Sequence, residues 1–317
     1  MRASTASVFT IDCNYVRSEF AGSYLRVDGQ GPSAEAAFID TNTTQSIPLL
    51  LAALDAQGLK PQQVRWIIVT HAHLDHAGGA GALALACPNA TILAHPRAAR
   101  HLIDPVKLET SARKVYGDAH FEQLYGTRLV PIPGDRVRVV EDNEEVPLGA
   151  SRFRFLHTRG HANHHVCIHD PALATVYTGD AFGLRYPALQ RSGLFVFPST
   201  SPTDFDGKAA LESIDRIVSC GARSVRPTHF GEVEDVVGAA VQLRSHLEYS
   251  SRLLERTILE APEDSMEKWV LHELRKEFER VLARDGHSFG NDEWSWINLD
   301  LELNAAGLAF VARKCRV

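Results

Sequence analysis

The sequence predicts a layered α/β fold with a helical extension at its C-terminal end. Short stretches rich in β-branched residues alternate with stretches whose apolar residues recur at helical spacing, and this alternation runs through two successive blocks. In proteins with that alternation the helices cover the outer faces of the sheets. After about residue 238 the pattern becomes almost wholly helical and charged. We therefore expect a catalytic domain over residues 1–238 and a helical extension over residues 239–317.

The first block predicts five strands and the helices that connect them. Apolar residues at helical spacing predict a helix over Ser46–Gln57, which Gly58 ends. A second helix is expected over Gly79–Ala86, and a helical region runs on to Leu124 after the fifth strand. The predicted strands of this block are Ser7–Asp12, Ser23–Val27, Ala36–Asp40, Val64–Thr70 and Thr91–Ala94.

The second block is rich in strands from Arg136 to Thr178 and ends in a helix and one more strand. Its helix is predicted over Asp206–Cys220. Helical periodicity then continues to Arg284, and a break precedes a last helix over Asp292–Arg313. The strands predicted for this block are Arg152–His157, His165–His169, Thr175–Thr178 and Ser224–Pro227.

Composition excludes several classes of protein. The chain of 317 residues has 33 Lys and Arg against 39 Asp and Glu, a net charge of −6, which argues against nucleic-acid or anionic membrane partners. No apolar run approaches the roughly 20 residues that cross a bilayer, and the N-terminal segment does not resemble a signal peptide. The five cysteines are scattered, without a Cys-x-x-Cys pair. We expect a cytoplasmic protein that acts on a small-molecule substrate.

The 15 histidines are the outstanding feature of the composition, and three of them follow one predicted strand end. The strand Val64–Thr70 runs directly into His71-Ala72-His73-Leu74-Asp75-His76. Because alternate residues of an extended chain face the same side, His71 and His73 can reach one metal ion. If the chain then turns into a helix, Asp75 and His76 point at a second position. Imidazole and carboxylate ligands suit zinc, iron or manganese.

Three more predicted strands are followed by a histidine or an aspartate. His161 lies shortly after one strand, Asp180 follows Thr175–Thr178, and His229 follows Ser224–Pro227. In α/β folds, ligands gather at the carboxyl ends of strands. We therefore predict one convergent site instead of a set of solvated loop histidines.

In order, the motifs Thr-His-x-His-x-Asp-His, Gly-His, Thr-Gly-Asp and a late Thr-His resemble those of the metallo-β-lactamase-fold superfamily of metallohydrolases, over about residues 5–235. The resemblance implies an αββα sandwich that binds two divalent metal ions, with zinc as first choice and iron or manganese as alternatives. The ligands that it implies are His71, His73 and His161 for one ion, Asp75, His76 and His229 for the other, and Asp180 as a bridge between them.

The resemblance also implies a dinuclear metal-dependent hydrolase, in which a metal-bridging hydroxide attacks a small ester, thioester or lactone and Asp75 is the catalytic residue that orients it. Glyoxalase II-like thioesterases likewise pair this site with C-terminal helices. Lactonases commonly place a tyrosine three residues after the bridging aspartate, where this chain has Gly183. Zinc β-lactamases usually have cysteine in place of Asp180, which disfavours antibiotic hydrolysis. A phosphodiesterase, an iron-dependent oxidoreductase of the persulfide dioxygenase type and a weakly active regulatory binder remain as alternatives.

Four further residues are given roles around this site. By position, His165 matches a histidine that supports the metal ligands in many members of the superfamily, with a core histidine as the alternative reading. Arg185 and Tyr186 are candidates for substrate binding, with an ion pair and ordinary packing as the alternatives. His157 is expected to be structural. The apolar face of the last helix is expected to dock on the core or on a partner subunit. In the second case the protein would be a homodimer.

Overall fold

The computed structural model describes residues 6–200, 205–286 and 288–316, which form two compact units. The first unit comprises the chain up to residue 157 together with residues 164–179 and 220–234. The second comprises residues 158–163, 180–219 and the chain from residue 235 onward. Residues 158–163 and 180–219 thus group with the C-terminal helices. The predicted boundary at residue 238 between a catalytic domain and a helical extension stays a prediction.

The first sheet contains six strands in the order β1-β2-β3-β4-β5-β6. The first three strands are antiparallel neighbours, and the strands from β3 to β6 are parallel. Parallel neighbours need a crossover connection, which the intervening helices supply. The strands are β1 (Ser7–Asp12), β2 (Gly22–Asp28), β3 (Glu35–Ile39), β4 (Val64–Val69), β5 (Thr91–Ala94) and β6 (Val137–Val139).

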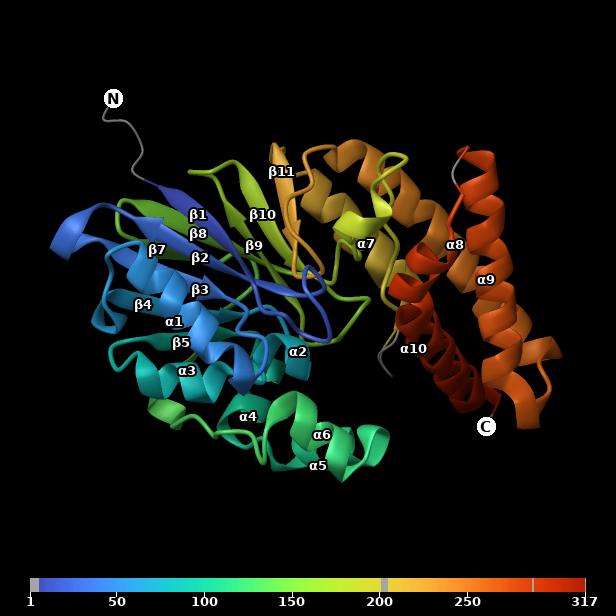
Figure 1. The fold of residues 1–317 in the computed structure, drawn as a ribbon, viewed down its shortest axis with the longest axis horizontal. Coiled ribbons are helices and arrows are strands. Elements are labelled where there is room, and N and C mark those ends of the chain that lie inside the picture. The colour runs from blue at the N-terminus through green and yellow to red at the C-terminus, as the bar shows by residue number, and fades with distance from the viewer. Residues whose placement is uncertain (1–5, 201–204, 287, 317) are drawn as a thin grey trace. The chain divides into compact units, whose positions relative to one another are not determined.

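Helices α1 and α3 lie against one face of this sheet (Figure 1). Leu50 and Leu54 of α1 and Leu83 of α3 are buried in the same apolar cluster as Phe38 and Ile67 of the strands. The helices of this unit are α1 (Ile47–Ala56), α2 (Leu74–Ala77), α3 (Ala80–Ala86), α4 (Pro96–Ile103), α5 (Val106–Tyr116) and α6 (Asp118–Tyr125).

A second sheet of five strands, in the order β11-β10-β9-β8-β7, packs on the first. The layer between them is apolar: Trp66 and Ile68 of β4 meet Phe153 and Phe155 of β8, and all four are buried. The first unit therefore has the layer order helix, sheet, sheet. The strands of this sheet are β7 (Glu145–Leu148), β8 (Ser151–His157), β9 (Val166–Asp170), β10 (Thr175–Gly179) and β11 (Ser224–Pro227).

The second unit is built from four long helices. Asp206 and Asp235 cap the first two, because their carboxylates accept hydrogen bonds from the backbone N–H groups of Ala209 and Gly238. Within this unit Trp296 of the last helix packs on Tyr186, so part of the predicted apolar face docks here, and a homodimer stays a prediction. The helices are α7 (Gly207–Val218), α8 (Val236–Glu260), α9 (Met266–Arg284) and α10 (Asn291–Arg316).

The fold class is confirmed: the chain has two sheets, helices around them and a C-terminal helical region. Most predicted elements begin and end within one or two residues of the observed bounds. The long helical stretch predicted after residue 238 divides into α8 and α9 at Ala261 and Pro262. Six short 3₁₀ helices complete the described elements, at Gly31–Ser33, Thr44–Ser46, Pro61–Gln63, Gly134–Arg136, Pro187–Leu189 and Glu263–Ser265.

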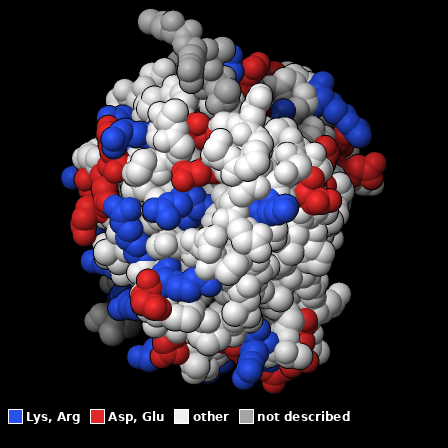
Figure 2. Space-filling model, turned by 90° about the vertical axis from the view of Figure 1, so that its left-hand side faces the viewer, with Lys and Arg blue, Asp and Glu red and all other residues white. Residues whose placement is uncertain are grey.

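The described residues form no helix that is both long enough and apolar enough to cross a membrane. On the face drawn in Figure 2, Lys and Arg side chains lie among Asp and Glu side chains, with broad areas of other residues between them. That face therefore has mixed charge instead of a field of one sign. The absence of nucleic-acid and membrane partners stays a prediction.

Candidate metal centre

The loop after β4 brings two histidines of the first unit together. The backbone is still extended at His73, where φ is −64° and ψ is 147°, and α2 begins at the next residue. This extended stretch allows the His71 and His73 side chains to converge, and His71 Nε2 lies 2.9 Å from His73 Nδ1. The alternation expected at a strand end is therefore what pairs these imidazoles.

Asp75, His76 and His229 form a second cluster in the same unit. Asp75 Oδ2 lies 3.3 Å from His229 Nε2 and 3.8 Å from His76 Nε2. One ligand atom from each residue lies within 4.8 Å of those from the other two. Both imidazoles are buried, whereas the Asp75 side chain is 26% exposed. This is the residue set predicted for one of the two metal ions.

The other ring nitrogen of each imidazole faces an acceptor. His76 Nδ1 lies 2.8 Å from Asp40 Oδ2, and His229 Nδ1 lies 2.8 Å from the Phe20 carbonyl oxygen. With Nδ1 as the donor in each ring, the Nε2 lone pairs of both face the Asp75 carboxylate. Histidines that ligate metals usually donate their second N–H in this way. The donor set of this cluster therefore fits a divalent ion.

Asp40 supports this cluster although the histidine motif does not include it. Its buried carboxylate accepts hydrogen bonds from the Thr70 N–H at 2.8 Å and from the Thr228 hydroxyl at 2.7 Å, in addition to its contact with His76. It directly follows β3, a parallel neighbour of β4, so the carboxyl ends of both strands meet at one edge of the sheet. The position of Asp40 at the end of a predicted strand could have indicated this role, because the histidine motif also lies at the end of a predicted strand.

His165 lies beside the predicted ligand His71. Their rings stack with centroids 4.9 Å apart and an interplanar angle of 29°, and His165 is fully buried. Gly179 permits this arrangement: with φ at +47°, a Cβ added there would stand 2.6 Å from His165 Nε2 and 2.7 Å from Thr70 Oγ1. The contact suits the predicted supporting role of His165, which stays a prediction.

His161 and Asp180 meet within the second unit. His161 Nε2 lies 3.5 Å from Asp180 Oδ2, while His161 Nδ1 faces the Ser199 carbonyl oxygen at 3.2 Å. This repeats the pattern of the first unit, with one ring nitrogen against a backbone carbonyl and the other against a carboxylate. Gly160 sets the path of the loop, because at φ +123° a Cβ there would come 2.3 Å from the backbone nitrogen of Ala210 in α7.

The predicted substrate-binding residues differ in what surrounds them. The Tyr186 ring is fully buried between Phe197 and Trp296, and its hydroxyl donates a hydrogen bond to Asp300 Oδ2 at 3.0 Å. This tyrosine therefore helps to hold α10. Arg185 is half-buried. A substrate contact by either residue stays a prediction.

The remaining histidines of the first unit include a pair in ring contact, of which His95 is buried and His157 is half-buried. His157 Nε2 donates to the Val140 carbonyl oxygen at 2.9 Å, which suits the structural role expected of it, and its ring lies 4.4 Å from that of His95. Burial, with smaller contributions from His157, His164 and Arg97, lowers the pKa of His95 to about 4. His95 is therefore neutral at neutral pH.

Comparisons with known proteins agree with the fold and the motifs. A family model described as the metallo-beta-lactamase superfamily matches residues 31–229. The metallo-beta-lactamase fold-containing protein ST1585 of Sulfurisphaera tokodaii is 33% identical over 171 residues, which are 53% of this chain and 61% of that protein. The aligned region thus spans less than two thirds of this curated relative.

Two solved structures have a similar fold over nearly the whole chain. The crystal structure of ST1585, an archaeal metallo-beta-lactamase superfamily protein from Sulfolobus tokodaii, has a TM-score of 0.63 at 24% identity and covers 95% of this chain and 98% of its own. The metallo-beta-lactamase family protein TTHA1429 of Thermus thermophilus has a TM-score of 0.61 at 20% identity, with coverages of 97% and 92%. At these identities the likeness shows the fold.

Proposed function

The chain belongs to the metallo-β-lactamase superfamily, and we propose that it is a metal-dependent hydrolase of small esters, thioesters or lactones. The cluster of Asp75, His76 and His229 carries this proposal, because a carboxylate and two imidazole nitrogens converge there. The contacts of His76 with Asp40 and of His229 with Phe20 fix which nitrogen of each ring faces a metal ion.

The proposed ligand set rests on the order of the motifs in the sequence and on the clusters within each unit. We assign Asp75, His76 and His229 to one ion and His71, His73 and His161 to the other, with Asp180 shared between them. Zinc is the proposed metal. Iron and manganese accept the same ligands, so elemental analysis must separate the three.

Two divalent ions bound by these residues would polarise the substrate carbonyl and lower the pKa of a water molecule. The side chains of the protein would orient the attacking water molecule. Asp75 is the partly exposed member of its cluster, so its carboxylate can accept a hydrogen bond from the attacking water and aim its lone pair at the carbonyl carbon. His76 and His229 are held by Asp40 and the Phe20 carbonyl oxygen, which keeps their rings in place.

We also propose that the protein works in the cytoplasm on a small molecule. The five cysteines, all in the part of the chain that the structure describes, form no disulfide, and three of them are buried, which suits a reducing compartment.

The experiment that tests the proposed function joins metal content to a substrate panel. Protein reconstituted with zinc, iron or manganese is assayed with p-nitrophenyl esters, acyl thioesters, acyl lactones and bis-p-nitrophenyl phosphate. We expect carbonyl substrates to be hydrolysed and activity to vanish with the metal. The variant Asp75→Asn should lose nearly all turnover. Turnover of the phosphodiester alone, or oxygen consumption with iron, would replace this proposal with one of its alternatives.

A further inference from the structure

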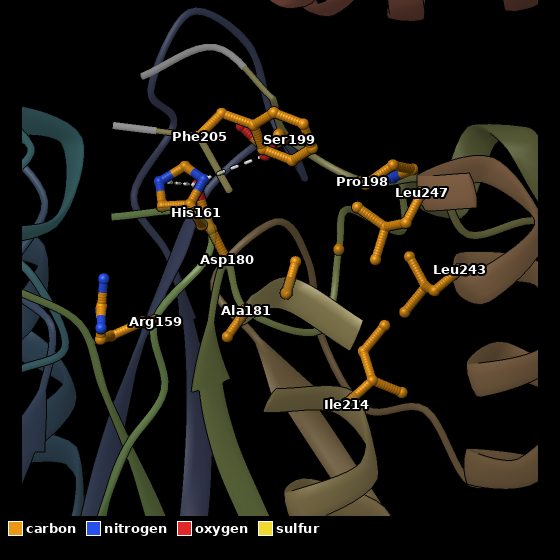
Figure 3. A pocket seen from close by; sticks show the side chains of 12 residues that line it. Arg159, His161, Asp180, Ala181, Pro198, Ser199, Phe205, Ile214, Leu243 and Leu247 are labelled. Carbon is orange, nitrogen blue, oxygen red and sulfur yellow. Dashed lines mark hydrogen bonds and ion pairs between the residues drawn. The ribbon is translucent and has the colours of Figure 1, made fainter. Parts of the chain in front are cut away.

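A small cavity lies within the second unit, next to His161 and Asp180. Figure 3 shows these two side chains on one side of it and Leu243 and Leu247 on the opposite side. Ile214 of α7 and Phe205 add further apolar walls. The cavity is thus polar at one end and apolar at the other.

The apolar end is closely packed. Ile214 and Leu243 are buried, with 0% and 1% exposure. Gly183 also lines the cavity, and a Cβ added to it would stand 2.4 Å from Leu243 Cδ2. The backbone at Gly183 therefore packs closely against Leu243. The cavity volume is about 10 Å³. That is room for about one group the size of a water molecule.

We propose that this cavity is the acyl subsite of the enzyme and that it limits the substrate to an acetyl-sized acyl group. The inference rests on the proposed function, since His161 and Asp180 are proposed metal ligands. A carbonyl placed at their end of the cavity directs its methyl group toward Leu243 and Ile214. A longer acyl chain meets these two side chains, which are buried.

An ordinary packing void is the alternative. The cavity is about the size of one water molecule, and it borders His161 and Asp180, two side chains of the predicted metal motifs. A packing void would leave substrate choice unchanged when its walls are trimmed. An acyl subsite ties the preferred chain length to the side chains at positions 243 and 214.

The test compares kcat/KM for p-nitrophenyl acetate, butanoate and hexanoate in the zinc-loaded enzyme. The wild type should prefer acetate. Leu243→Ala should raise the ratio of butanoate to acetate turnover by about tenfold or more, because one methylene in an apolar pocket changes selectivity by that much. Ile214→Val, which is milder and keeps a variant available if Leu243→Ala fails to fold, should raise it in the same direction. Val241→Ala serves as the control, since Val241 lies on α8 like Leu243 but is 60% exposed.

Binding gives a second readout that does not depend on turnover. Calorimetric titration of the zinc-loaded proteins with acetate, butanoate and hexanoate should show the same shift of preference in Leu243→Ala. If the wild type hydrolyses esters but neither ratio changes in the variants, the acyl subsite is wrong and the hydrolase proposal stands. If no carbonyl substrate turns over but carboxylate preference still shifts, the hydrolase proposal is wrong and the cavity is a binding subsite. An unchanged preference in both assays overturns the inference.

Discussion

Asp40 contacts two loops of the first unit that carry proposed metal ligands. It holds the backbone of Thr70 next to His71, the hydroxyl of Thr228 next to His229, and the imidazole of His76 itself. A carboxylate with three such contacts holds the proposed metal ligand His76 and the neighbours of the proposed ligands His71 and His229.

The variant Asp40→Ala should therefore weaken metal binding about 10- to 100-fold, the usual effect of removing a partner of a metal-ligating histidine. The measurement is competition with a chromophoric chelator. Thr228→Ser, which keeps the hydroxyl, is the matched control and should bind metal like the wild type. Equal metal affinity in wild type and Asp40→Ala would refute the positioning role.

His246 predicts a pH dependence of stability. It is buried beside Phe195 and Phe278, and burial lowers its pKa to about 4 from an ordinary 6.5, while Glu277 opposes the shift. Because the unfolded chain takes up this proton first, His246 costs stability as the pH falls from 6.5 toward 4. The loss has a slope of at most about 1.4 kcal/mol per pH unit.

Replacing His246 with phenylalanine should remove this contribution. We expect the difference in unfolding free energy between about pH 8 and about pH 5, on either side of the ordinary histidine pKa, to be smaller in His246→Phe than in the wild type. Urea denaturation measures it. The exposed His272, changed to phenylalanine in parallel, controls for the loss of a histidine from the same unit. An unchanged pH dependence in His246→Phe would show that His246 is not neutral in the folded protein.

At the scale of elements, the loop of residues 158–163 depends on its close approach to α7. The Asp206 N–H donates a hydrogen bond to the Gly160 carbonyl oxygen at 2.9 Å, and the Ser213 hydroxyl donates to that of Arg159 at 2.6 Å. His161 is carried on this loop, so the position of the imidazole depends on contact between the loop backbone and the helix.

Gly160→Ala should break this contact. Its Cβ would collide with the Ala210 backbone, and we expect the variant to lose about 1–3 kcal/mol of unfolding free energy more than Gly286→Ala. Gly286 also has a positive φ, +73°, but an added Cβ there meets nothing within 4 Å, so Gly286→Ala measures the cost of a positive φ without a collision. Thermal and urea unfolding measure the difference, and equal losses in both variants would contradict the packing argument.

The same elements show what the sequence can and cannot predict. Strand ends and helix ends follow from periodicity and from breakers such as Gly58, and the histidine motif follows from the alternation of an extended chain. Asp40 was assigned to a strand but not to the site, because one aspartate at a strand end has no motif around it. The packing role of Gly160 does not follow from the sequence, because its contact with Ala210 joins segments far apart along the chain. Packing is the alternative interpretation of Tyr186, but its partner Asp300 is also distant in the sequence and could not be predicted.

At the scale of the whole molecule, the proposed ligands are distributed along the chain from His71 to His229. A centre built from ligands so far apart in the sequence forms only when the chain is folded, so the proposed function couples metal binding to folding. Zinc should therefore raise the unfolding temperature in a concentration-dependent way. Thermal scans of chelator-treated protein, with and without added zinc, measure this effect, and Val241→Ala should respond like the wild type.

The claim that this chain is a two-metal hydrolase is tested most directly by its metal content and turnover together. Elemental analysis of purified, reconstituted protein should give about two divalent ions per chain, and hydrolysis of p-nitrophenyl acetate should rise and fall with that content. Asp180→Ala should lose metal and nearly all turnover. Full hydrolysis by a metal-free protein, or by Asp180→Ala without bound metal, would contradict the account.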